Sequence, residues 1–414
     1  MLLRILLLLF ILLIVPDVYI YIRYVRRWTC HWLWRALTFL PTILLLLYML
    51  LVLQHDDMRV EHQPVIGLFM FVFLLYTVPR MLFTLLDLLG LFVFPRIIRI
   101  IAMTVALFSC ILLCYGYFIG RNRFVVHQQT FYFPNLPQEF DGYRIAHFGD
   151  LHIGTFGDGH QQDVTTIVHL INDQKCDAIL FTGDLVNYES RETDGYKQVL
   201  GSLQAPDGVF AVMGNHDYSM YIPAEQAVRD ADIQELQRRE RSYGWTLLLN
   251  DNVVIHHGND SIAIVGSEND GTGRFPALGD LPRATAGLIH VMCNDTATVH
   301  LISYNGDSIE AQPDTLFVKP TDHTFAILLS HDPTHWWRHV LPDTRIDLML
   351  AGHTHAGQFK VFGWSPVAFV YDEWSGAYTE GIQILNVTDG VGQVMFPFRF
   401  GAWPEINIIT LKRP

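Results

Sequence analysis

The stretch AHFGDLHIG, residues 146–154, decides the fold, because it joins an apolar run to a carboxylate and an imidazole. The run RIAHF (144–148) has the length and composition of a buried strand, and Gly149, Asp150 and His152 follow it directly. Glycine lets the backbone turn sharply where a strand ends. The stretch is therefore typical of a strand that delivers polar side chains to the edge of a sheet, where α/β proteins bind ligands.

Four later apolar runs end in the same way, in Asp, Asn or His, and three of them reach these residues through a glycine. The four ends are Gly183-Asp184, Gly214-Asn215-His216-Asp217, His331-Asp332 and Gly352-His353-Thr354-His355. Because the carboxyl ends of strands in α/β sheets converge on one edge, we expect these side chains to form one site.

Short apolar runs alternate with polar, helix-like stretches from residue 123 to residue 414, which predicts an α/β domain over this range. The predicted strands are 144–148, 177–181, 209–213, 261–266, 324–330 and 347–351, and the predicted helices are 160–174, 189–204 and 223–243. The stretch 282–323 has weaker periodicity, and we interpret it as an insertion.

The strand ends supply seven nitrogen or oxygen donors and no thiolate, namely Asp150, His152, Asp184, Asn215, His331, His353 and His355. This set suits Mn, Fe or Zn. Seven ligands are too many for one ion, but two ions can share them if one carboxylate bridges. Each motif alone has an ordinary explanation, since a lone histidine is more often a core residue than a ligand. Burying so many ionisable groups together without metal would be costly, which favours a dinuclear centre.

The order Asp-x-His, Gly-Asp, Gly-Asn-His-Asp, His, Gly-His-x-His resembles that of the calcineurin-like metallophosphoesterases over about residues 138–411. The segments FAVMGNHDY, ILLSHDP, LMLAGHTHAGQ and PFRFGAWPEINIITLKR are most similar to a membrane-associated bacterial branch related to the UDP-2,3-diacylglucosamine pyrophosphohydrolases. The resemblance implies a four-layer α/β/β/α sandwich.

The resemblance also implies roles for individual residues. One divalent ion is expected on Asp150, His152, Asp184 and His355, and a second on Asp184, Asn215, His331 and His353, with Mn as the first choice of metal. His216 is the expected general acid or transition-state stabiliser beside the leaving oxygen, and Asp217 is expected to orient it.

Residues 1–122 are predicted to form an all-α transmembrane domain of about four helices, at the apolar runs 2–22, 36–53, 66–90 and 97–119. No small-residue cleavage site follows the first run, so we expect an uncleaved helix. The loops 23–35 and 95–99 hold six arginines against four on the opposite side. The positive-inside rule then predicts a multi-pass protein of the inner, or cytoplasmic, membrane with domain 123–414 on the external or periplasmic side.

Arg80 and Asp87 lie in the third apolar run, about two helical turns apart. Such charges either form a functional site inside the membrane or lock helices together.

The net charge of −13 is unevenly distributed, because residues 1–119 carry about +4 and the rest about −17. An acidic domain is a poor partner for nucleic acid, whose binding depends on cationic side chains. An acidic protein that handles phosphate usually needs metal ions to invert the local field.

We therefore expect a membrane-anchored phosphoesterase that uses metal-activated hydroxide to hydrolyse a phosphodiester or pyrophosphate bond. Its expected partners are the lipid bilayer and a phosphate-ester substrate, including a lipid-linked one. The aromatic-rich segment 359–378 and Trp336-Trp337 either form an acyl-chain groove or pack as a cap. The alternatives are a phosphatase of soluble nucleotides or phosphoproteins, and a non-enzymatic membrane scaffold or transporter with a structural metal site.

Overall fold

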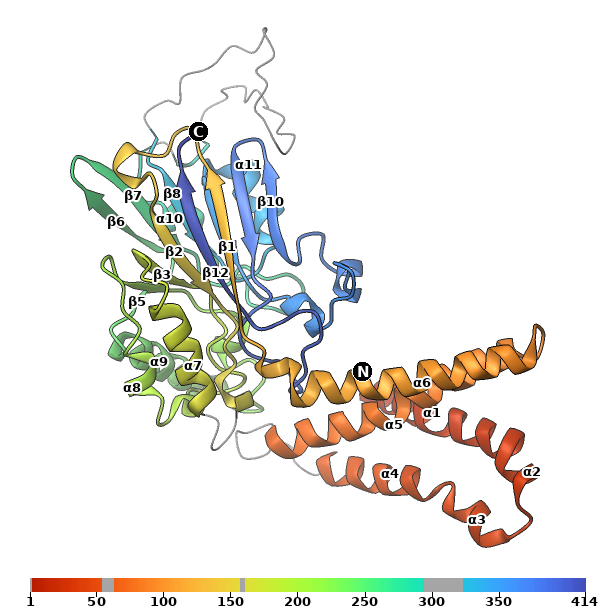
Figure 1. Cartoon of the computed structure of the whole chain (residues 1–414). Helices are drawn as coiled ribbons and strands as arrows, with labels where there is room; N and C mark the ends of the chain where they lie inside the picture. The colour runs from red at the N-terminus through yellow and green to blue at the C-terminus, as the bar shows by residue number, and fades with distance from the viewer. Residues whose placement is uncertain (1, 54–62, 157–160, 290, 294–322) are drawn as a thin grey trace. The chain divides into compact units, whose positions relative to one another are not determined.

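The computed structural model describes residues 2–53, 63–156, 161–289, 291–293 and 323–414. The chain folds into two compact units (Figure 1). The helical unit comprises Met1–Arg121 together with Met395–Phe400, and the sheet unit comprises Asn122–Val394 together with Gly401–Pro414.

The helical unit is made of apolar helices. Its elements are α1 (Leu2–Ile20), the π-helical turn η1 (Tyr21–Val25), α2 (Arg26–Trp28), α3 (Trp32–Leu37), α4 (Leu40–Leu53), α5 (Gln63–Leu89) and α6 (Pro95–Phe118). Among the described residues, three segments are long and apolar enough to cross a membrane: Trp32–Leu51, Val65–Leu89 and Pro95–Asn122. The sequence predicted about four. The run 2–22 does form α1, but α1 is not among these three segments, and its side chains over 2–9 lie outside the description.

The two charged residues of α5 do not pair with each other. Arg80 forms an ion pair with Asp17 of α1, whereas Asp87 lies 3.4 Å from the Nε of Arg99 in α6. Both carboxylates are buried and also accept hydrogen bonds from hydroxyl groups, Asp17 from Thr42 and Tyr76, and Asp87 from Tyr19 and Tyr24. Each charge therefore joins α5 to a neighbouring helix, as the helix-locking interpretation predicts.

The segment Met395–Phe400 belongs to the helical unit although it lies late in the sequence. Phe398 packs directly on α6 at Gly116, where an added Cβ would lie 2.2 Å from the phenyl ring. The backbone N–H of Arg399 donates to the carbonyl oxygen of Gly116 at 3.2 Å. A glycine in a helix of this kind lets another segment approach its backbone closely.

The sheet unit contains two six-stranded sheets (Figure 1). The first has the order β1-β12-β2-β3-β4-β5, with bounds Val125–Tyr132, Glu405–Lys412, Arg144–Phe148, Ala178–Phe181, Val209–Ala211 and Thr246–Leu247. The second has the order β10-β11-β9-β8-β7-β6, with bounds Gly376–Glu380, Gln383–Val387, Leu348–Ala351, Ala326–Leu329, Asp260–Gly266 and Asp251–His257. Strands β2, β3 and β4 are parallel, as are β7, β8 and β9.

Side chains on opposite faces of each strand enter different cores. In β2, Ile145 joins the core between the sheets, while Ala146 joins the core shared with α7 (Gln161–Asn172) and α9 (Gln226–Ser242). In β9, Leu348 faces the first sheet, while Met349 joins a third core with α10 (Leu281–Ala284) and the π-helical turn η8 (Trp336–Val340). Three cores separate four layers, so the predicted α/β/β/α sandwich is confirmed.

One predicted helix is wrong. The range 189–204 forms a 3-10 turn η6 (Ser190–Thr193) and a short helix α8 (Lys197–Leu200), because Gly195 between them has a left-handed φ of +81°. Most of the predicted insertion 282–323 lies outside the described residues.

Candidate metal centre

Both sheets contribute to the predicted site. Asp150, Asp184 and Asn215 follow β2, β3 and β4 of the first sheet, and His331, His353 and His355 follow β8 and β9 of the second. The structure brings all seven predicted ligands together. All are buried except His353, which is partly exposed. The site therefore lies where the carboxyl ends of two sheets meet, rather than at the edge of a single sheet.

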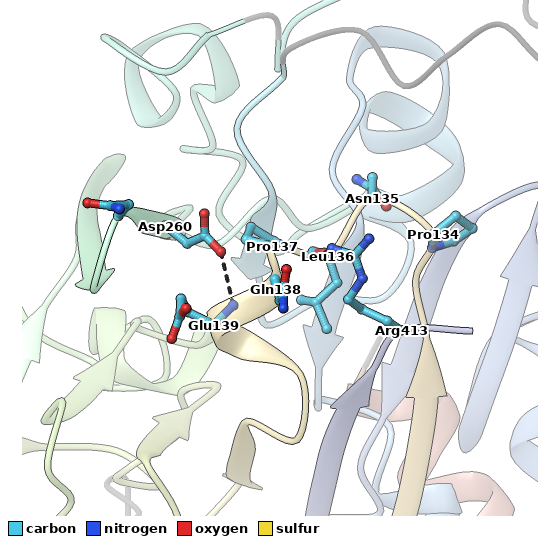
Figure 2. A pocket seen from close by; sticks show the side chains of 9 residues that line it. Pro134, Asn135, Leu136, Pro137, Gln138, Glu139, Asp260 and Arg413 are labelled. Atoms are coloured by element: carbon cyan, nitrogen blue, oxygen red, sulfur yellow. Dashed lines mark hydrogen bonds between the residues drawn. The ribbon is translucent and has the colours of Figure 1, made fainter.

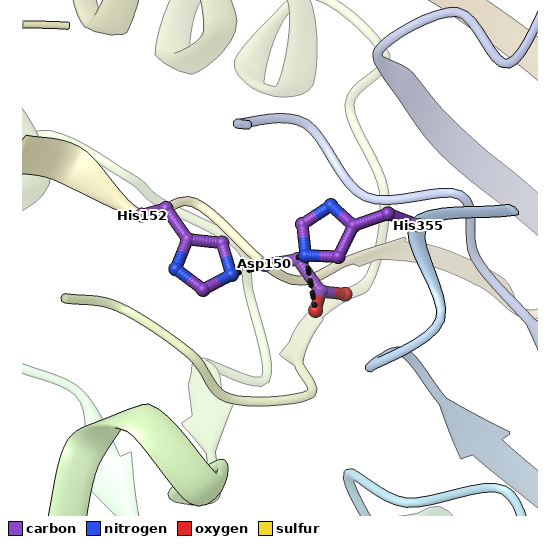
Figure 3. A group of neighbouring side chains, drawn as sticks. All are labelled: Asp150, His152 and His355. Atoms are coloured by element: carbon purple, nitrogen blue, oxygen red, sulfur yellow. Dashed lines mark hydrogen bonds and ion pairs between the residues drawn. The ribbon is translucent and has the colours of Figure 1, made fainter. Parts of the chain in front are cut away.

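Asp150, His152 and His355 form one group of potential ligands, with their donor atoms within 4.8 Å of one another (Figure 3). The Nε2 atom of His355 lies 3.3 Å from Oδ1 of Asp150 and 3.0 Å from Nε2 of His152. Two imidazole nitrogens and a carboxylate oxygen thus face one point.

A second group contains Asp184, His331 and His353. The Oδ1 atom of Asn215 lies 3.2 Å from Nε2 of His331 and 2.8 Å from Nδ1 of His353. The Oδ2 atom of Asp184 lies 3.2 Å from Nε2 of His331 and 3.5 Å from Nε2 of His152. One carboxylate oxygen therefore faces both groups.

These spacings fit metal coordination. Neighbouring ligands of an ion bound at ~2.1 Å lie roughly 3 Å apart, which is close to the distances within each group. The converging atoms are imidazole nitrogens, carboxylate oxygens and one amide oxygen, all of which bind divalent cations such as Mn, Fe or Zn. The donor set fits two cations that share Asp184.

Glycines before the ligands make the close approach possible. A Cβ at Gly214 would lie 2.2 Å from Oδ1 of Asp184, and a Cβ at Gly352 would lie 2.2 Å from Oδ2 of Asp150. Five of the seven ligands also have a left-handed backbone, with φ of 54° at Asp150, 43° at His152, 57° at Asp184, 74° at His353 and 51° at His355. Such strain costs about 1–3 kcal/mol per residue and is concentrated at functional sites.

His216 lies beside the first group, with its ring 4.7 Å from the ring of His152. Its Nδ1 atom lies 2.7 Å from the carbonyl oxygen of Asn187. A carbonyl oxygen only accepts hydrogen bonds, so Nδ1 carries a proton, and Nε2 is left for other partners.

Asp217 was predicted to orient His216, but its carboxylate accepts hydrogen bonds from backbone N–H groups instead. Its carboxylate accepts the backbone N–H groups of Gly214 and Asp184 at 2.8 Å, and those of Leu185 and Val186 at 2.9 and 3.1 Å. It therefore holds together the loops after β3 and β4, whereas the Asn187 carbonyl orients His216.

The electrostatics of the site centre on Asp184. Burial would lower the pKa of His331, but the Asp184 carboxylate raises it to about 10. Burial lowers the pKa of His353 to about 4, with a further contribution from His331. Burial raises the pKa of Asp217 to about 7, and the charge of Asp184 adds to this effect. The buried Asp184 carboxylate thus needs positive charge beside it, which a proton on His331 or a cation supplies.

Three aromatic residues that the motifs do not include also contact the site. The hydroxyl of Tyr371 lies 2.8 Å from Nε2 of His353, and the ring of Phe275 lies 5.0 Å from that imidazole. The ring of Tyr221 lies 4.5 Å from that of His216. Tyr371 lies in the aromatic-rich segment already noted in the sequence, but Tyr221 and Phe275 lie in loops that carry no such signal.

The sheet unit also has a separate pocket of about 450 Å³ (Figure 2). It is lined by Pro134, Asn135, Leu136, Pro137, Gln138, Glu139, Asn259, Asp260 and Arg413. The backbone N–H of Glu139 donates to Asp260 across it at 2.9 Å. The pocket contains none of the predicted ligands, so it is distinct from the metal centre.

Comparison with known proteins agrees with this geometry. The family model described as Calcineurin-like phosphoesterase matches residues 143–357. The chain is 26% identical over 318 residues to YkuE of Bacillus subtilis, described as an uncharacterized metallophosphoesterase, covering 72% of this chain and 90% of that protein.

Two further relatives have names that specify a substrate or a transmembrane protein. The UDP-2,3-diacylglucosamine pyrophosphatase LpxG of Chlamydia trachomatis is 27% identical over 298 residues, covering 66% of this chain and 86% of LpxG. A transmembrane protein with metallophosphoesterase domain from Danio rerio is 27% identical over 284 residues, covering 67% of this chain and 55% of that protein.

The family match extends over more than half of the chain and includes every side chain of the two ligand groups. The chain therefore belongs to the calcineurin-like phosphoesterase family and is a metal-dependent hydrolase of phosphoester bonds.

Proposed function

We propose that the protein is a membrane-anchored phosphoesterase that hydrolyses a phosphodiester or pyrophosphate bond in a lipid-linked substrate. The observation that carries this proposal is the pair of ligand groups sharing Asp184, in a chain that also has three helices long enough to cross a membrane. The 27% identical relative that is named a UDP-2,3-diacylglucosamine pyrophosphatase supports a lipid-linked substrate.

In this proposal Asp150, His152, Asp184 and His355 hold one divalent cation. Asp184, Asn215, His331 and His353 hold the second, and Mn is the expected metal. Two bound cations polarise a phosphoryl oxygen and lower the pKa of a water molecule toward neutrality. Asp217 keeps the ligand loops in position through the four backbone N–H groups it accepts.

His216 acts as the general acid. Its Nδ1 proton is held by the Asn187 carbonyl, so Nε2 donates to the leaving oxygen. Burial lowers the pKa of His216, and the Asp184 carboxylate opposes this. The negative charge of a bound phosphate ester acts in the same direction as Asp184 and favours the protonated ring in the enzyme–substrate complex.

An exposed apolar loop supports a lipid-linked substrate. Phe362, Phe369 and Val370 are 104%, 83% and 75% exposed, which is unusual for residues of this kind. The next residue along the chain, Tyr371, contacts His353 of the metal centre. We propose that an acyl chain lies along this loop while the phosphate group lies at the metal centre. Of the other aromatic candidates, Trp336 is fully buried and packs in a core, whereas Trp337 is 50% exposed.

The test of the reaction is hydrolysis by the full chain, purified in detergent and supplied with Mn²⁺. The wild type should cleave a bis-aryl phosphate, and elemental analysis should find two metal ions per chain. Asp184→Asn and His216→Ala should each reduce hydrolysis by at least about a thousandfold. His339→Ala, which removes a half-exposed histidine from η8, is the matched control and should leave the rate unchanged. Full activity in Asp184→Asn or His216→Ala would refute the roles given to them.

The test of the substrate class uses the exposed loop. The double variant Phe362→Ser and Phe369→Ser should weaken hydrolysis of a UDP-diacylglucosamine-like lipid about tenfold or more but leave bis-aryl phosphate turnover intact. If the wild type prefers nucleotides to that lipid, the protein is a phosphatase of soluble substrates.

We also propose that residues 1–122 form the transmembrane domain and 123–414 the catalytic domain. In this arrangement the protein is a multi-pass inner-membrane protein whose catalytic domain lies on the external side. The arginine distribution of the loops supports this orientation.

A further inference from the structure

The helical unit contains a pocket of about 310 Å³ that is unrelated to the metal centre. It is lined by Arg23, Tyr24, Arg27, Trp28 and Arg99, and we call it the arginine pocket. These residues come from the turn formed by η1 and α2 and from the first turns of α6. Three guanidinium groups and two aromatic rings therefore meet at one end of the apolar helices.

The charges of the arginine pocket do not cancel. Asp87 is the acidic residue that pairs with its arginines in the described part of the chain, and it is only 2% exposed. Its carboxylate accepts the hydroxyls of Tyr19 and Tyr24 at 2.7 and 2.6 Å and lies 3.4 Å from Nε of Arg99. One carboxylate against three guanidinium groups leaves an excess of about two positive charges.

Arg23 has a donor that the protein does not use. Its Nε is buried, forms no hydrogen bond with any described residue, and lies 3.9 Å from Oδ2 of Asp87. A buried donor without an acceptor is costly, so an anionic ligand at this position would be stabilised. Arginine binds phosphate well, because its planar fork of N–H groups matches two phosphate oxygens.

Exposed aromatic residues near the arginine pocket indicate its expected depth in a bilayer. Trp28 and Trp32 are 81% and 72% exposed, and Phe92 and Phe94, in the turn between α5 and α6, are 85% and 69% exposed. Tryptophan is enriched where a membrane-spanning helix reaches the headgroup region. In a bilayer, this end of the apolar helices is therefore expected at the level of the lipid phosphates.

We infer that the arginine pocket binds the phosphate of an anionic phospholipid headgroup. Basic pockets between membrane helices bind such headgroups through combined charge and hydrogen bonding. The site is separate from the metal centre and does not depend on the proposed reaction.

The experiment measures lipid binding to the full chain in detergent by native mass spectrometry, with phosphatidylglycerol as the probe and phosphatidylcholine as its neutral counterpart. Arg27→Gln should weaken phosphatidylglycerol binding about fivefold, the factor expected for one cation at a lipid surface. The matched control is Arg26→Gln. Arg26 is adjacent to Arg27, equally charged and also exposed, but does not line the pocket, so binding should change less than twofold.

Arg27→Lys keeps the charge without the fork, and its affinity should lie between those of the wild type and Arg27→Gln. Equal effects of Arg26→Gln and Arg27→Gln would show a general surface charge and overturn the inference. Equal binding of both lipids by the wild type would overturn it as well. Glycerol 3-phosphate and inorganic phosphate are the competitors, and neither should displace the lipid at equal concentration. Displacement by either would assign the pocket to a soluble phosphate instead.

Discussion

At the scale of single residues, the site depends on one oxygen atom that two groups share. Oδ2 of Asp184 faces both ligand groups, and Gly214 leaves room for the other oxygen of this carboxylate. We expect Gly214→Ala to displace Asp184, to lower the metal content below two per chain, and to reduce hydrolysis about a hundredfold or more.

Elemental analysis and turnover of a bis-aryl phosphate measure this effect. The control is Gly244→Ala, which imposes strain at a φ of +88° but meets no atom within 4 Å. It should destabilise the protein by about 1 kcal/mol and retain both metals. Normal metal content in Gly214→Ala would contradict the expected crowding.

A second prediction concerns Glu240 of α9, which is fully buried and whose carboxyl oxygens have no hydrogen-bond partner in the described part of the chain. Burial raises its pKa well above the ordinary value, Asp217 adds to this effect, and Arg241 opposes it. Because the pKa of Glu240 is higher in the folded than in the unfolded chain, its contribution to the free energy of unfolding is fully present below the unfolded pKa of ~4.3. This contribution is lost as the pH rises toward the folded pKa.

Glu240→Gln removes this ionisation, so the variant should be more stable than the wild type at pH 8 and about equal to it near pH 4. Hydrogen exchange of peptides from α9, followed at both pH values, measures the difference. A stability gap that is independent of pH would rule out ionisation of Glu240 as its cause.

The donor residues could be predicted from sequence because each follows a buried strand through a short motif. The hydrogen-bond partner of His216 could not be predicted, because it is the backbone carbonyl of Asn187 and every residue has a backbone carbonyl. The left-handed backbone of Asp150 and His152 could not be predicted either, since residues other than glycine give no reliable sequence signal for a positive φ.

At the scale of elements, the loop that presents the Asn187 carbonyl is itself held by Glu192 of η6. This buried carboxylate accepts the N–H groups of Asn187 and Tyr188 at 2.7 and 2.8 Å. We expect Glu192→Ala to loosen the loop and to lower hydrolysis by about 10–100-fold while the metal content stays at two.

Paired activity and metal measurements test this expectation. Asp194→Ala removes a neighbouring carboxylate that is 66% exposed and pairs with Arg239, so it should have little effect. Loss of metal in Glu192→Ala would show that this loop positions the metal ligands and not only His216.

The strands that carry ligands were predicted because they are short, apolar and buried on both faces. Six strands were not predicted from the sequence, namely β1, β5, β6, β10, β11 and β12, and four of them, β1, β5, β6 and β10, lie at sheet edges. β12 pairs with β1 across 280 positions of the sequence, and no local pattern reveals such a partner. The predicted helix 189–204 failed because Gly195 interrupts an otherwise helical composition.

At the scale of the whole molecule, the arginine distribution predicts which ends of the helices face the cytoplasm. Cys30 is exposed in the short turn between α2 and α3, which is predicted to be cytoplasmic. With the other cysteines replaced, a membrane-impermeant maleimide should label Cys30 only after cells are permeabilised. A cysteine introduced at Asn259, in the sheet unit, should be labelled in intact spheroplasts. The reverse pattern would invert the orientation.

The composition of the sequence predicted the division of the chain into an apolar and a mixed part. It did not predict that Met395–Phe400 belongs to the helical unit. The segment PFRFG looked like part of the phosphoesterase pattern, whereas Phe398 packs on Gly116 of α6. This contact depends on shape at a glycine in a distant helix, which no local sequence pattern reports.

Because Met395–Phe400 is built into the helical unit, the chain crosses between its two units three times, after Arg121, after Val394 and after Phe400. A single cut in the backbone should therefore not shed the catalytic part from the membrane. If a specific protease site is inserted at the exposed Asn122 and cleaved, the larger fragment should stay in the pellet through a carbonate wash. Polar substitution of Phe398 should release it.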